Sequence, residues 1–329
     1  MTKTRAIRFH QTGGPEVLRW EELDLPEPQA HEARVRQHGV GLNYIDIYHR
    51  SGLYPVPLPS GIGLEGAGVV EAIAAEISAK TGIAVGDRVA YAGGPIGAYA
   101  QARNIPADRL VKLPDAIAFD TAAAMMLQGM TAQYLLRRTY RVQPGDTILI
   151  HAAAGGVGLI ACQWAKALGA TVIGTVGSEE KAALARAHGC DHAIIYTREN
   201  FTERVRAITG GAGVPVVYDS IGKDTFMGSL DCLRPLGMMV SFGNASGPVP
   251  PVDLGILAPK GSLFVTRPTM MTYLAKRDDL LQSAAELFAV VAAGSVRIEV
   301  NQRYALQDAA VAQSDLAARR TTGSTILLP

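Results

Sequence analysis

The stretch TILIHAAAGGVGLIACQWAKALGATVIGTVG, residues 147–177, constrains the fold of this chain more than any other segment. An apolar run ends near His151, a turn of small residues follows, and a helix-length segment begins at once. Ala153, Gly155 and Gly158 occupy the three positions of the G-x-G-x-x-G fingerprint, with alanine in the first. The first of these glycines lets backbone approach a pyrophosphate, the second lets the helix pack on the strand, and the helix N-terminus offers N–H groups to phosphates. Strand, turn and helix in this order predict a dinucleotide site.

The end of the second strand in this stretch favours NADPH over NADH. NAD sites usually place an acid there to hold the ribose 2′-hydroxyl, whereas residues 173–178 read IGTVGS. Ser178 and Lys181 can offer a hydroxyl and a cation to a 2′-phosphate instead. Glu179 and Glu180 have a structural explanation, because acids in the first turn of a helix capped by Ser178 complement the helix dipole. We therefore expect NADPH as the cofactor.

The sequence pattern divides the chain into three zones. Residues 1–120 consist of short alternating runs separated by Gly and Pro, which predicts a β-rich domain. In residues 121–296, apolar β-branched runs alternate with helix-length segments, which predicts an α/β domain with a doubly wound parallel sheet. Residues 297–329 again have a pattern typical of strands, on both sides of a helix-like stretch, and such a C-terminal segment can fold back onto the first domain. The strands expected in the middle zone lie near 147–151, 171–176, 192–195, 215–218, 238–242 and 261–266, and its helices include 156–168, 179–187 and 200–208.

Composition excludes several classes of protein. Hydrophobic residues make up 48% and charged residues 19%, an ordinary globular composition. The net charge of +1 argues against nucleic acid as the main partner, because nucleic-acid binding normally needs a clustered basic face. The N-terminus lacks the apolar region of a signal peptide. Residues 147–165 carry no charge, but their glycine cluster fits a buried strand, turn and helix better than a membrane span. We expect a soluble, cytoplasmic protein that contacts no membrane.

Cysteine and histidine spacing gives no sign of a metal site. Cys162, Cys190 and Cys232 form no C-x-x-C pair and are interpreted as buried thiols in a reducing compartment. The seven histidines are scattered, and no H-E-x-x-H motif occurs. Ser-His-Asp catalysis stays open, although the chain has no G-x-S-x-G elbow. Metal-free hydride transfer, whose chemistry the nicotinamide carries, becomes the leading hypothesis.

Taken together, these features resemble the zinc-free medium-chain dehydrogenase/reductases, and within them the quinone oxidoreductase (zeta-crystallin-like) family. The matching segments run through essentially the whole chain in order: GGPEVL, GLNYIDIYHRSGLYP, GLEGAGVV, VGDRVAY, MTAQYLL, HAAAGGVGLIACQWAKALGA, VYDSIGKDT, MVSFGNASG and GSLFVTRP. The resemblance implies a GroES-like, β-rich catalytic domain made from both chain ends, a Rossmann domain, NADPH and a homodimer. Zinc-dependent relatives carry a Cys ligand at the position of Asn43 and a His ligand at that of Leu64, so the resemblance implies no bound metal.

The resemblance also implies roles for single residues, each carried over by its place in a matching motif. The pyrophosphate loop corresponds to Ala154, Gly155, Gly156, Val157 and Gly158. The 2′-phosphate side corresponds to Gly177, Lys181, Tyr196 and Arg319, beside the Ser178 inferred above, with Arg320 as an alternative to Arg319. The nicotinamide ribose and carboxamide side corresponds to Phe242, Gly243, Asn244, Val265, Thr266 and Arg267. The polar lining of an interdomain nicotinamide and quinone cleft corresponds to Asn43, Tyr48, Tyr54 and Thr131. Structural alternatives exist: Tyr48 can simply face solvent, and Tyr196 can be a core residue.

Three functions compete on this basis. The first is NADPH:quinone oxidoreduction, with Asn43 and Tyr48 orienting the acceptor, a flat electrophile such as a quinone. The second is NADPH-dependent reduction of an enone or enoyl thioester, with Tyr54 as the proton donor. The third is a non-enzymatic role as a structural crystallin-like protein or an RNA-binding protein, against which the balanced charge argues.

Overall fold

The chain folds into two compact units, and the computed structural model describes residues 2–329. The first unit contains the described residues up to Met130, together with Leu274–Phe288 and Ile298–Pro329. The second unit contains Thr131–Tyr273 and Ala289–Arg297. The C-terminal segment therefore joins the N-terminal one, as the resemblance implies.

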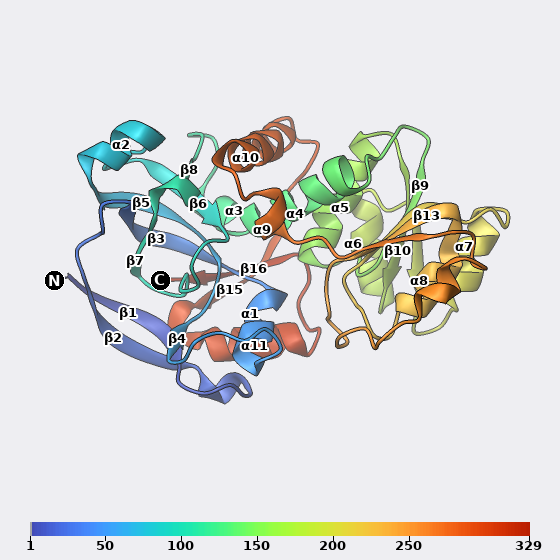
Figure 1. The fold of residues 1–329 in the computed structure, drawn as a ribbon, viewed down its shortest axis with the longest axis horizontal. Helices are drawn as coiled ribbons and strands as arrows, with labels where there is room; N and C mark the ends of the chain where they lie inside the picture. Colours follow the sequence, from blue (N-terminus) through green and yellow to red (C-terminus); the bar gives the residue numbers. More distant parts are fainter. Residues whose placement is uncertain (1) are drawn as a thin grey trace. The chain divides into compact units, whose positions relative to one another are not determined.

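The second unit is built on a six-stranded, wholly parallel sheet with the order β11-β10-β9-β12-β13-β14. Its strands are β9 (Thr147–Ile150), β10 (Thr171–Val176), β11 (His192–Ile195), β12 (Val214–Asp219), β13 (Leu233–Ser241) and β14 (Phe264–Thr266). The helices that follow the strands are α5 (Gly156–Ala167), α6 (Glu179–Ala187), α7 (Phe201–Ile208) and α8 (Phe226–Cys232), with α9 (Met270–Tyr273) after β14. Figure 1 shows these elements in the green to orange part of the ribbon.

The strand order of this sheet confirms the predicted Rossmann fold and locates its switch point. The chain leaves β9 toward β10 and β11 on one side and later returns to place β12, β13 and β14 on the other. The switch therefore lies between β9 and β12, and ligands of such sheets bind beyond the carboxyl ends of the strands at that point. Leu149, Ile173 and Val217, one from each of the three central strands, are fully buried in a core that holds the sheet together.

The first unit contains two sheets. A three-stranded antiparallel sheet has the order β2-β1-β4, and a larger sheet has the order β15-β16-β3-β5-β6-β8, with β7 also paired to β3. The strands are β1 (Thr2–Phe9), β2 (Arg19–Leu25), β3 (Glu32–Leu42), β4 (Ser60–Gly61), β5 (Glu65–Ile73), β6 (Arg88–Ala92), β7 (Ala102–Pro106), β8 (Val111–Lys112), β15 (Val300–Ala305) and β16 (Ser324–Leu328). The helices are α1 (Tyr44–Ser51), α2 (Ala75–Thr81), α3 (Phe119–Ala123) and α11 (Ala309–Ala317), while α4 (Met126–Tyr134) and α10 (Arg277–Ala292) contribute residues to both units. This β-rich unit confirms the GroES-like domain that the resemblance implies.

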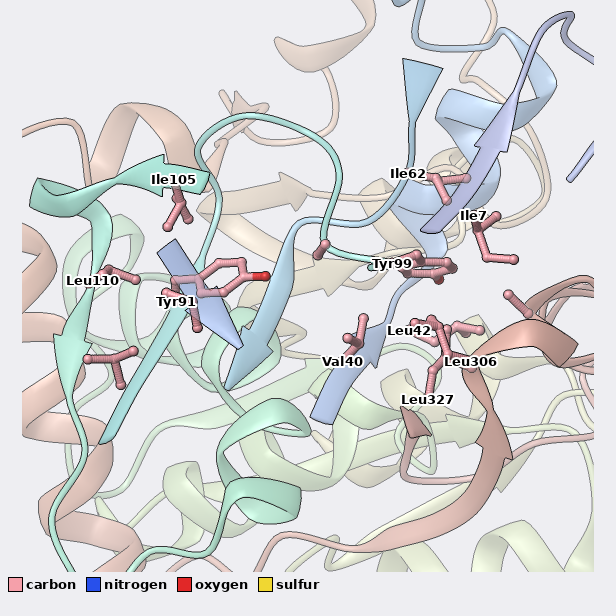
Figure 2. Close-up of a cluster of buried hydrophobic side chains, with 14 of the residues drawn as sticks. Ile7, Val40, Leu42, Ile62, Tyr91, Tyr99, Ile105, Leu110, Leu306 and Leu327 are labelled. Atoms are coloured by element: carbon pink, nitrogen blue, oxygen red, sulfur yellow. The ribbon is translucent and has the colours of Figure 1, made fainter. Parts of the chain in front are cut away.

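The last strand of the chain completes the core of the first unit. β16 pairs antiparallel with β3, where Ile326 lies opposite Gly41 and Leu327 opposite Val40. Figure 2 shows Leu327 and Leu306 beside Val40 and Leu42, with Tyr99 close by, although these residues come from opposite ends of the sequence. All five side chains are at most 2% exposed. The hydrophobic effect therefore ties the C-terminal strand to the N-terminal domain.

The observed units differ from the expected zones 1–120, 121–296 and 297–329 at the helix α10, which was expected to lie in the middle zone. Its residues up to Phe288 belong to the first unit. Arg277 donates hydrogen bonds to the carbonyl oxygens of Asp108 (2.7 Å) and Thr81 (3.0 Å). Leu287 packs so closely on Gly129 that a β-carbon there would lie 2.5 Å from its methyl carbon. These contacts are long-range in sequence, so helical periodicity alone could not assign α10 to a unit.

Candidate functional site

The turn between β9 and α5 has the geometry of a phosphate-binding turn. Gly155 is the N-cap of α5, and because it has no side chain the first turn of the helix receives no side-chain cap. A β-carbon on Gly158 would lie 2.8 Å from the Cα and carbonyl carbon of Ala153, and closer still to the carbonyl oxygen of Ala152. Glycine at 158 thus lets α5 approach the strand, as predicted, and the uncapped N–H groups at the start of α5 suit an anion. The predicted loop residues Ala154, Gly155, Gly156, Val157 and Gly158 all lie in this turn or the first turn of α5.

The ends of β10 and β11 bring together the residues predicted for the 2′-phosphate side in this unit. A β-carbon on Gly177 would lie 3.0 Å from the Tyr196 hydroxyl, and Tyr196 is 43% exposed, so it is not a core tyrosine. Glu179 pairs with Arg198 at 2.7 Å, which agrees with its structural explanation. The hydroxyl of Ser178 accepts a hydrogen bond from the Lys181 backbone N–H at 3.3 Å.

The Ser178 hydroxyl is also occupied as a donor. It donates to the carboxylate of Glu180, which lowers the pKa of that acid. Ser178 therefore works as the N-cap of α6 in this conformation, with both its donor and its acceptor used. Ser178 and Lys181 were both predicted to contact the 2′-phosphate. Of these two, the ammonium group of Lys181 is the better partner for a phosphate, because it carries a positive charge.

The loop after β13 holds the residues predicted for the nicotinamide side. The guanidinium of Arg267, just beyond β14, donates to the carbonyl oxygens of Ser241 (2.8 Å) and Gly243 (3.5 Å). A β-carbon on Gly243 would lie 2.9 Å from the Cα of Ser220, so only glycine fits there without a shift. Phe242 donates its N–H to the carbonyl oxygen of Asp219 at 2.8 Å. Arg267 therefore fixes the loop that carries Phe242, Gly243 and Asn244, and Val265 and Thr266 lie on the adjacent strand β14.

A buried hydrogen-bond chain links the phosphate-binding turn to the end of β12. His151 bonds through Nδ1 to the Thr175 hydroxyl (2.8 Å) and through Nε2 to the Ser229 hydroxyl (2.9 Å), which donates to Asp219 at 2.9 Å. The other carboxylate oxygen of Asp219 accepts the N–H groups of residues 221 and 222. His151 and Ser229 are at most 2% exposed, and burial lowers the pKa of the histidine. This Ser-His-Asp set therefore supports the backbone and offers no accessible nucleophile.

A second polar cluster lies in the first unit around Asn43, the residue before α1. The amide Nδ2 of Asn43 donates to Glu65 at 2.7 Å, and its Oδ1 accepts from Gln128 at 3.2 Å. Glu65 is fully buried and also accepts the N–H of Leu127 at 2.8 Å. Burial raises the pKa of Glu65 to about 8. Asn43 is thus held by a network that the sequence did not reveal, although Glu65 stands next to Leu64 in a segment on which the resemblance rests.

A second buried acid lies on the other side of Asn43. Asp46 accepts hydrogen bonds at one carboxylate oxygen from the Asn43 backbone N–H (2.9 Å) and from the Tyr99 hydroxyl (2.8 Å). Its other oxygen is buried and makes no hydrogen bond. Burial raises the pKa of Asp46 to about 7 and that of the Tyr99 phenol well above its ordinary value. Asn43 is therefore flanked by two carboxyls, Asp46 and Glu65, whose pKa values are raised by burial.

The two predicted tyrosines lie together at the C-terminal end of α1. The rings of Tyr48 and Tyr54 meet edge to face with centroids 5.2 Å apart, and the Tyr54 N–H donates to the Tyr48 carbonyl oxygen at 3.0 Å. Tyr48 is 8% exposed, which excludes the alternative that it faces solvent, whereas Tyr54 is half-buried. Thr131 is buried on α4 in the second unit and hydrogen-bonds Tyr134, whose pKa burial raises to about 12.

The C-terminal arginines differ in what they contact. Arg320 donates to Asp315 at 2.9 Å, and Asp315 also accepts the Tyr304 hydroxyl at 2.6 Å. Arg319 is exposed and adopts a left-handed backbone conformation with φ 60° just beyond α11. Arg320 is therefore held at the end of α11 by the Asp315 carboxylate.

Residues 2–329 contain no group of three His, Cys, Asp or Glu side chains placed to hold a metal ion. Within the same range, no helix combines the length and the apolar character needed to cross a bilayer. All three cysteines are free and buried.

Comparison with known proteins gives full-length matches. Residues 29–115 match the family model of the alcohol dehydrogenase GroES-like domain, and residues 156–289 match that of the zinc-binding dehydrogenases. A quinone oxidoreductase of Pseudomonas aeruginosa is 58% identical over 99% of both chains. A 2-haloacrylate reductase of Burkholderia is 47% identical over 98% of both. The crystal structure of Escherichia coli quinone oxidoreductase complexed with NADPH superimposes with a TM-score of 0.96 at 50% identity, covering 99% of this chain and 100% of that one. The chain therefore belongs to the quinone oxidoreductase family of the zinc-free medium-chain dehydrogenase/reductases.

Proposed function

We propose that this protein is an NADPH-dependent quinone oxidoreductase that works without a metal. The observation that carries the proposal is the 58% identity, over 99% of both chains, to a protein named quinone oxidoreductase. The β9–α5 turn supports it, because its glycines and uncapped helix terminus fit a pyrophosphate. The cofactor assignment is supported by the NADPH complex of the E. coli relative and by the absence of an acid at the end of β10.

The residues of the second unit bind and orient the cofactor in this proposal. The N–H groups of the β9–α5 turn hold the pyrophosphate, Lys181 and Tyr196 hold the adenosine side, and the loop fixed by Arg267 receives the nicotinamide ribose. When bound, NADPH supplies the hydride, so that a quinone gains a hydride and a proton and leaves as the hydroquinone. The protein itself contributes position and electrostatics rather than a reactive group.

The residues of the first unit orient the acceptor. Asn43 donates an amide hydrogen to the quinone carbonyl oxygen, and Tyr48 adds a second polar group. A hydroquinone anion is a tolerable product, so the reaction needs no strong general acid. The reduction of an enoyl thioester would need one, for which Tyr54 is the candidate.

We also propose a homodimer and a reducing compartment such as the cytoplasm. β14 is an edge strand of the sheet and carries exposed apolar side chains, Phe264 at 56% and Val265 at 40%. Such an edge suits pairing with a second copy of the chain. Three free, buried thiols suit a reducing environment.

Absorbance of NADPH over time tests the activity, with 1,4-benzoquinone, a naphthoquinone, a crotonyl thioester and a 2-haloacrylate as acceptors and NADH in parallel. We expect rapid oxidation of NADPH with both quinones and slow oxidation of NADH. Oxidation with the thioester alone would replace quinone reduction by enoyl reduction. Oxidation with the haloacrylate alone would assign the activity named for the Burkholderia relative.

A further inference from the structure

Asn43 is one member of a chain of hydrogen bonds that crosses four segments of the first unit. Leu127 donates its N–H to Oε1 of Glu65 (2.8 Å), and Oε2 of Glu65 accepts Nδ2 of Asn43 (2.7 Å). Oδ1 of Asn43 accepts Nε2 of Gln128 (3.2 Å), whose Oε1 accepts the Ser324 hydroxyl (2.6 Å). The four side chains are at most 7% exposed.

The two ends of this chain give it a direction. A backbone N–H can only donate, so the Leu127 N–H requires an acceptor at Oε1 of Glu65. An ionised carboxylate can only accept, so Oε2 requires a donor, and the amide of Asn43 must turn Nδ2 toward it. Its Oδ1 then faces Gln128. The ionised Glu65 carboxylate therefore requires this orientation of the Asn43 amide.

The surroundings of Glu65 are built to hold its carboxylate in this place. Gly41 on β3 lies against it, and a β-carbon at that position would overlap both the Glu65 carboxylate and the carbonyl oxygen of Ala123. Glu65 itself begins β5, which is paired with β3 and β6. The backbone of Gly41 and the N–H of Leu127 therefore both confine the carboxylate.

We propose that Glu65 is a positioning residue that fixes the amide of Asn43 with its N–H group available to the acceptor carbonyl. This inference rests on the proposed role of Asn43 in quinone binding. It assigns Glu65 an action through Asn43, without contact between Glu65 and the substrate.

The substitution Glu65→Gln tests the direction of this hydrogen-bond chain, because each of its members from Leu127 to Ser324 can keep a partner while the direction reverses. The introduced glutamine must present its oxygen to the Leu127 N–H, so its amide nitrogen faces Asn43. Asn43 then turns Oδ1 toward that nitrogen and Nδ2 toward Gln128, and Gln128 turns its own nitrogen toward Ser324. The Ser324 hydroxyl can donate to the carbonyl oxygen of Ala124, which lies 2.8 Å away. All members stay paired, but the donor and acceptor atoms of Asn43 change places.

The expected result is a loss of turnover without a loss of folding. At pH 9, where Glu65 is ionised in the parent, Glu65→Gln lowers kcat with 1,4-benzoquinone by about tenfold or more, while the KM for NADPH and the Tm stay close to those of the parent. The matched control is Glu71→Gln, the same change on the same strand at a surface ion pair with Arg36, and it keeps the parental kcat. A kcat of Glu65→Gln within twofold of the parent would overturn the proposal.

A double-mutant cycle with Asn43→Ala separates positioning from a general structural effect. If Glu65 acts through Asn43, then Glu65→Gln causes no further loss of kcat in the Asn43→Ala background. Equal losses in both backgrounds contradict the proposal. If Glu65→Gln does not fold, Glu65→Gln combined with Gln128→Glu keeps one buried carboxylate, locks the same reversed direction and gives the same expectation.

The pH profile provides a further readout. A protonated Glu65 with its hydrogen on Oε2 has the polarity of glutamine, so the parental kcat rises with pH near 8 and that of Glu65→Gln does not. The other titratable groups facing Glu65 are Asp46 on α1, Tyr91 on β6 and Tyr99 before β7, and they are unchanged in the variant. A rise near pH 8 that persists in Glu65→Gln contradicts the proposal. The activity of the parent is measured first. If none of the quinones supports oxidation of NADPH by the parent, the proposed function itself is refuted.

Discussion

The substitutions Gly158→Ala and Gly155→Ala each add one methyl group to the same turn, and together they distinguish an effect on folding from an effect on cofactor binding. In Gly158→Ala the new β-carbon would lie 2.8 Å from two backbone atoms of Ala153, which cannot move aside as a side chain would. α5 must therefore shift away from the strand. Such overpacking costs about 1–3 kcal/mol, which corresponds to a fall in Tm of roughly 2–12 °C at about 2–4 °C per kcal/mol.

Gly155→Ala has a different expected outcome. Gly155 has φ −81° and ψ 173°, an extended conformation open to any residue, and the nearest atom to a new β-carbon is the Ala152 carbonyl oxygen at 3.2 Å. The fold therefore tolerates the methyl group, and the Tm should change by no more than about 2 °C, since no backbone must move far. The methyl group lies at the turn that we propose to receive the pyrophosphate. We expect the affinity for NADPH to fall at least about tenfold, or about 1.4 kcal/mol.

Two assays on the same samples check both expectations. Circular dichroism during heating gives the Tm, and titration of NADPH fluorescence gives the Kd. The displaced helix in Gly158→Ala should weaken NADPH binding as well as folding, whereas Gly155→Ala should weaken binding alone. A parental Kd in Gly155→Ala would show that the pyrophosphate does not approach this turn. A parental Tm in Gly158→Ala would refute the packing argument.

Three further changes test other parts of the molecule. The folded protein keeps the proton of Asp46 up to about pH 7, whereas an unfolded aspartate loses it near pH 4, so the free energy of unfolding should fall as pH rises through this window. In urea titrations at several pH values, Asp46→Asn should make that fall smaller. An unchanged dependence on pH would contradict the raised pKa. Arg267→Met removes the donors to the carbonyl oxygens of Ser241 and Gly243. Because hydrogen bonds from charged groups contribute about 1.5–3 kcal/mol, the Kd for NADPH should rise about tenfold or more in fluorescence titrations. An unchanged Kd would argue against a role of that loop in binding NADPH. Phe264→Glu places a charge on the edge strand β14 and should convert the proposed dimer to a monomer in light scattering after gel filtration. A dimer that persists in this variant would contradict an interface at β14.

The cofactor domain could be predicted from sequence because its signals are local. The strand expected at 171–176 and the helix expected at 179–187 have those bounds in the structure, and α5 ends one residue before the expected 168. The glycine turn works through backbone geometry within a few residues, so Gly158 predicts a close approach that the structure contains. The prediction that Ser178 contacts a 2′-phosphate was weaker, because the sequence cannot show that the Ser178 hydroxyl donates its hydrogen bond to the neighbouring Glu180.

The assignment of α10 and the network around Asn43 could not be predicted in this way. Both depend on contacts between residues far apart in sequence: Arg277 reaches Thr81, and Gln128 reaches Ser324. Periodicity shows that α10 has an apolar face but not which surface that face covers. Similarly, Glu65 is a single acid in a glycine-rich segment, and nothing local to it indicates that Asn43 and Gln128 will meet it.

A carboxyl as fully buried as that of Glu65 costs free energy unless its neighbours compensate its charge. Two features reduce that cost: the Asn43 amide and the Leu127 N–H both donate to the carboxylate, and burial raises its pKa to about 8, so that the neutral form is accessible. Asn43 is therefore a partner that the buried Glu65 requires, and an alanine at position 43 should raise the pKa of Glu65 further, because it removes a donor to the ionised form.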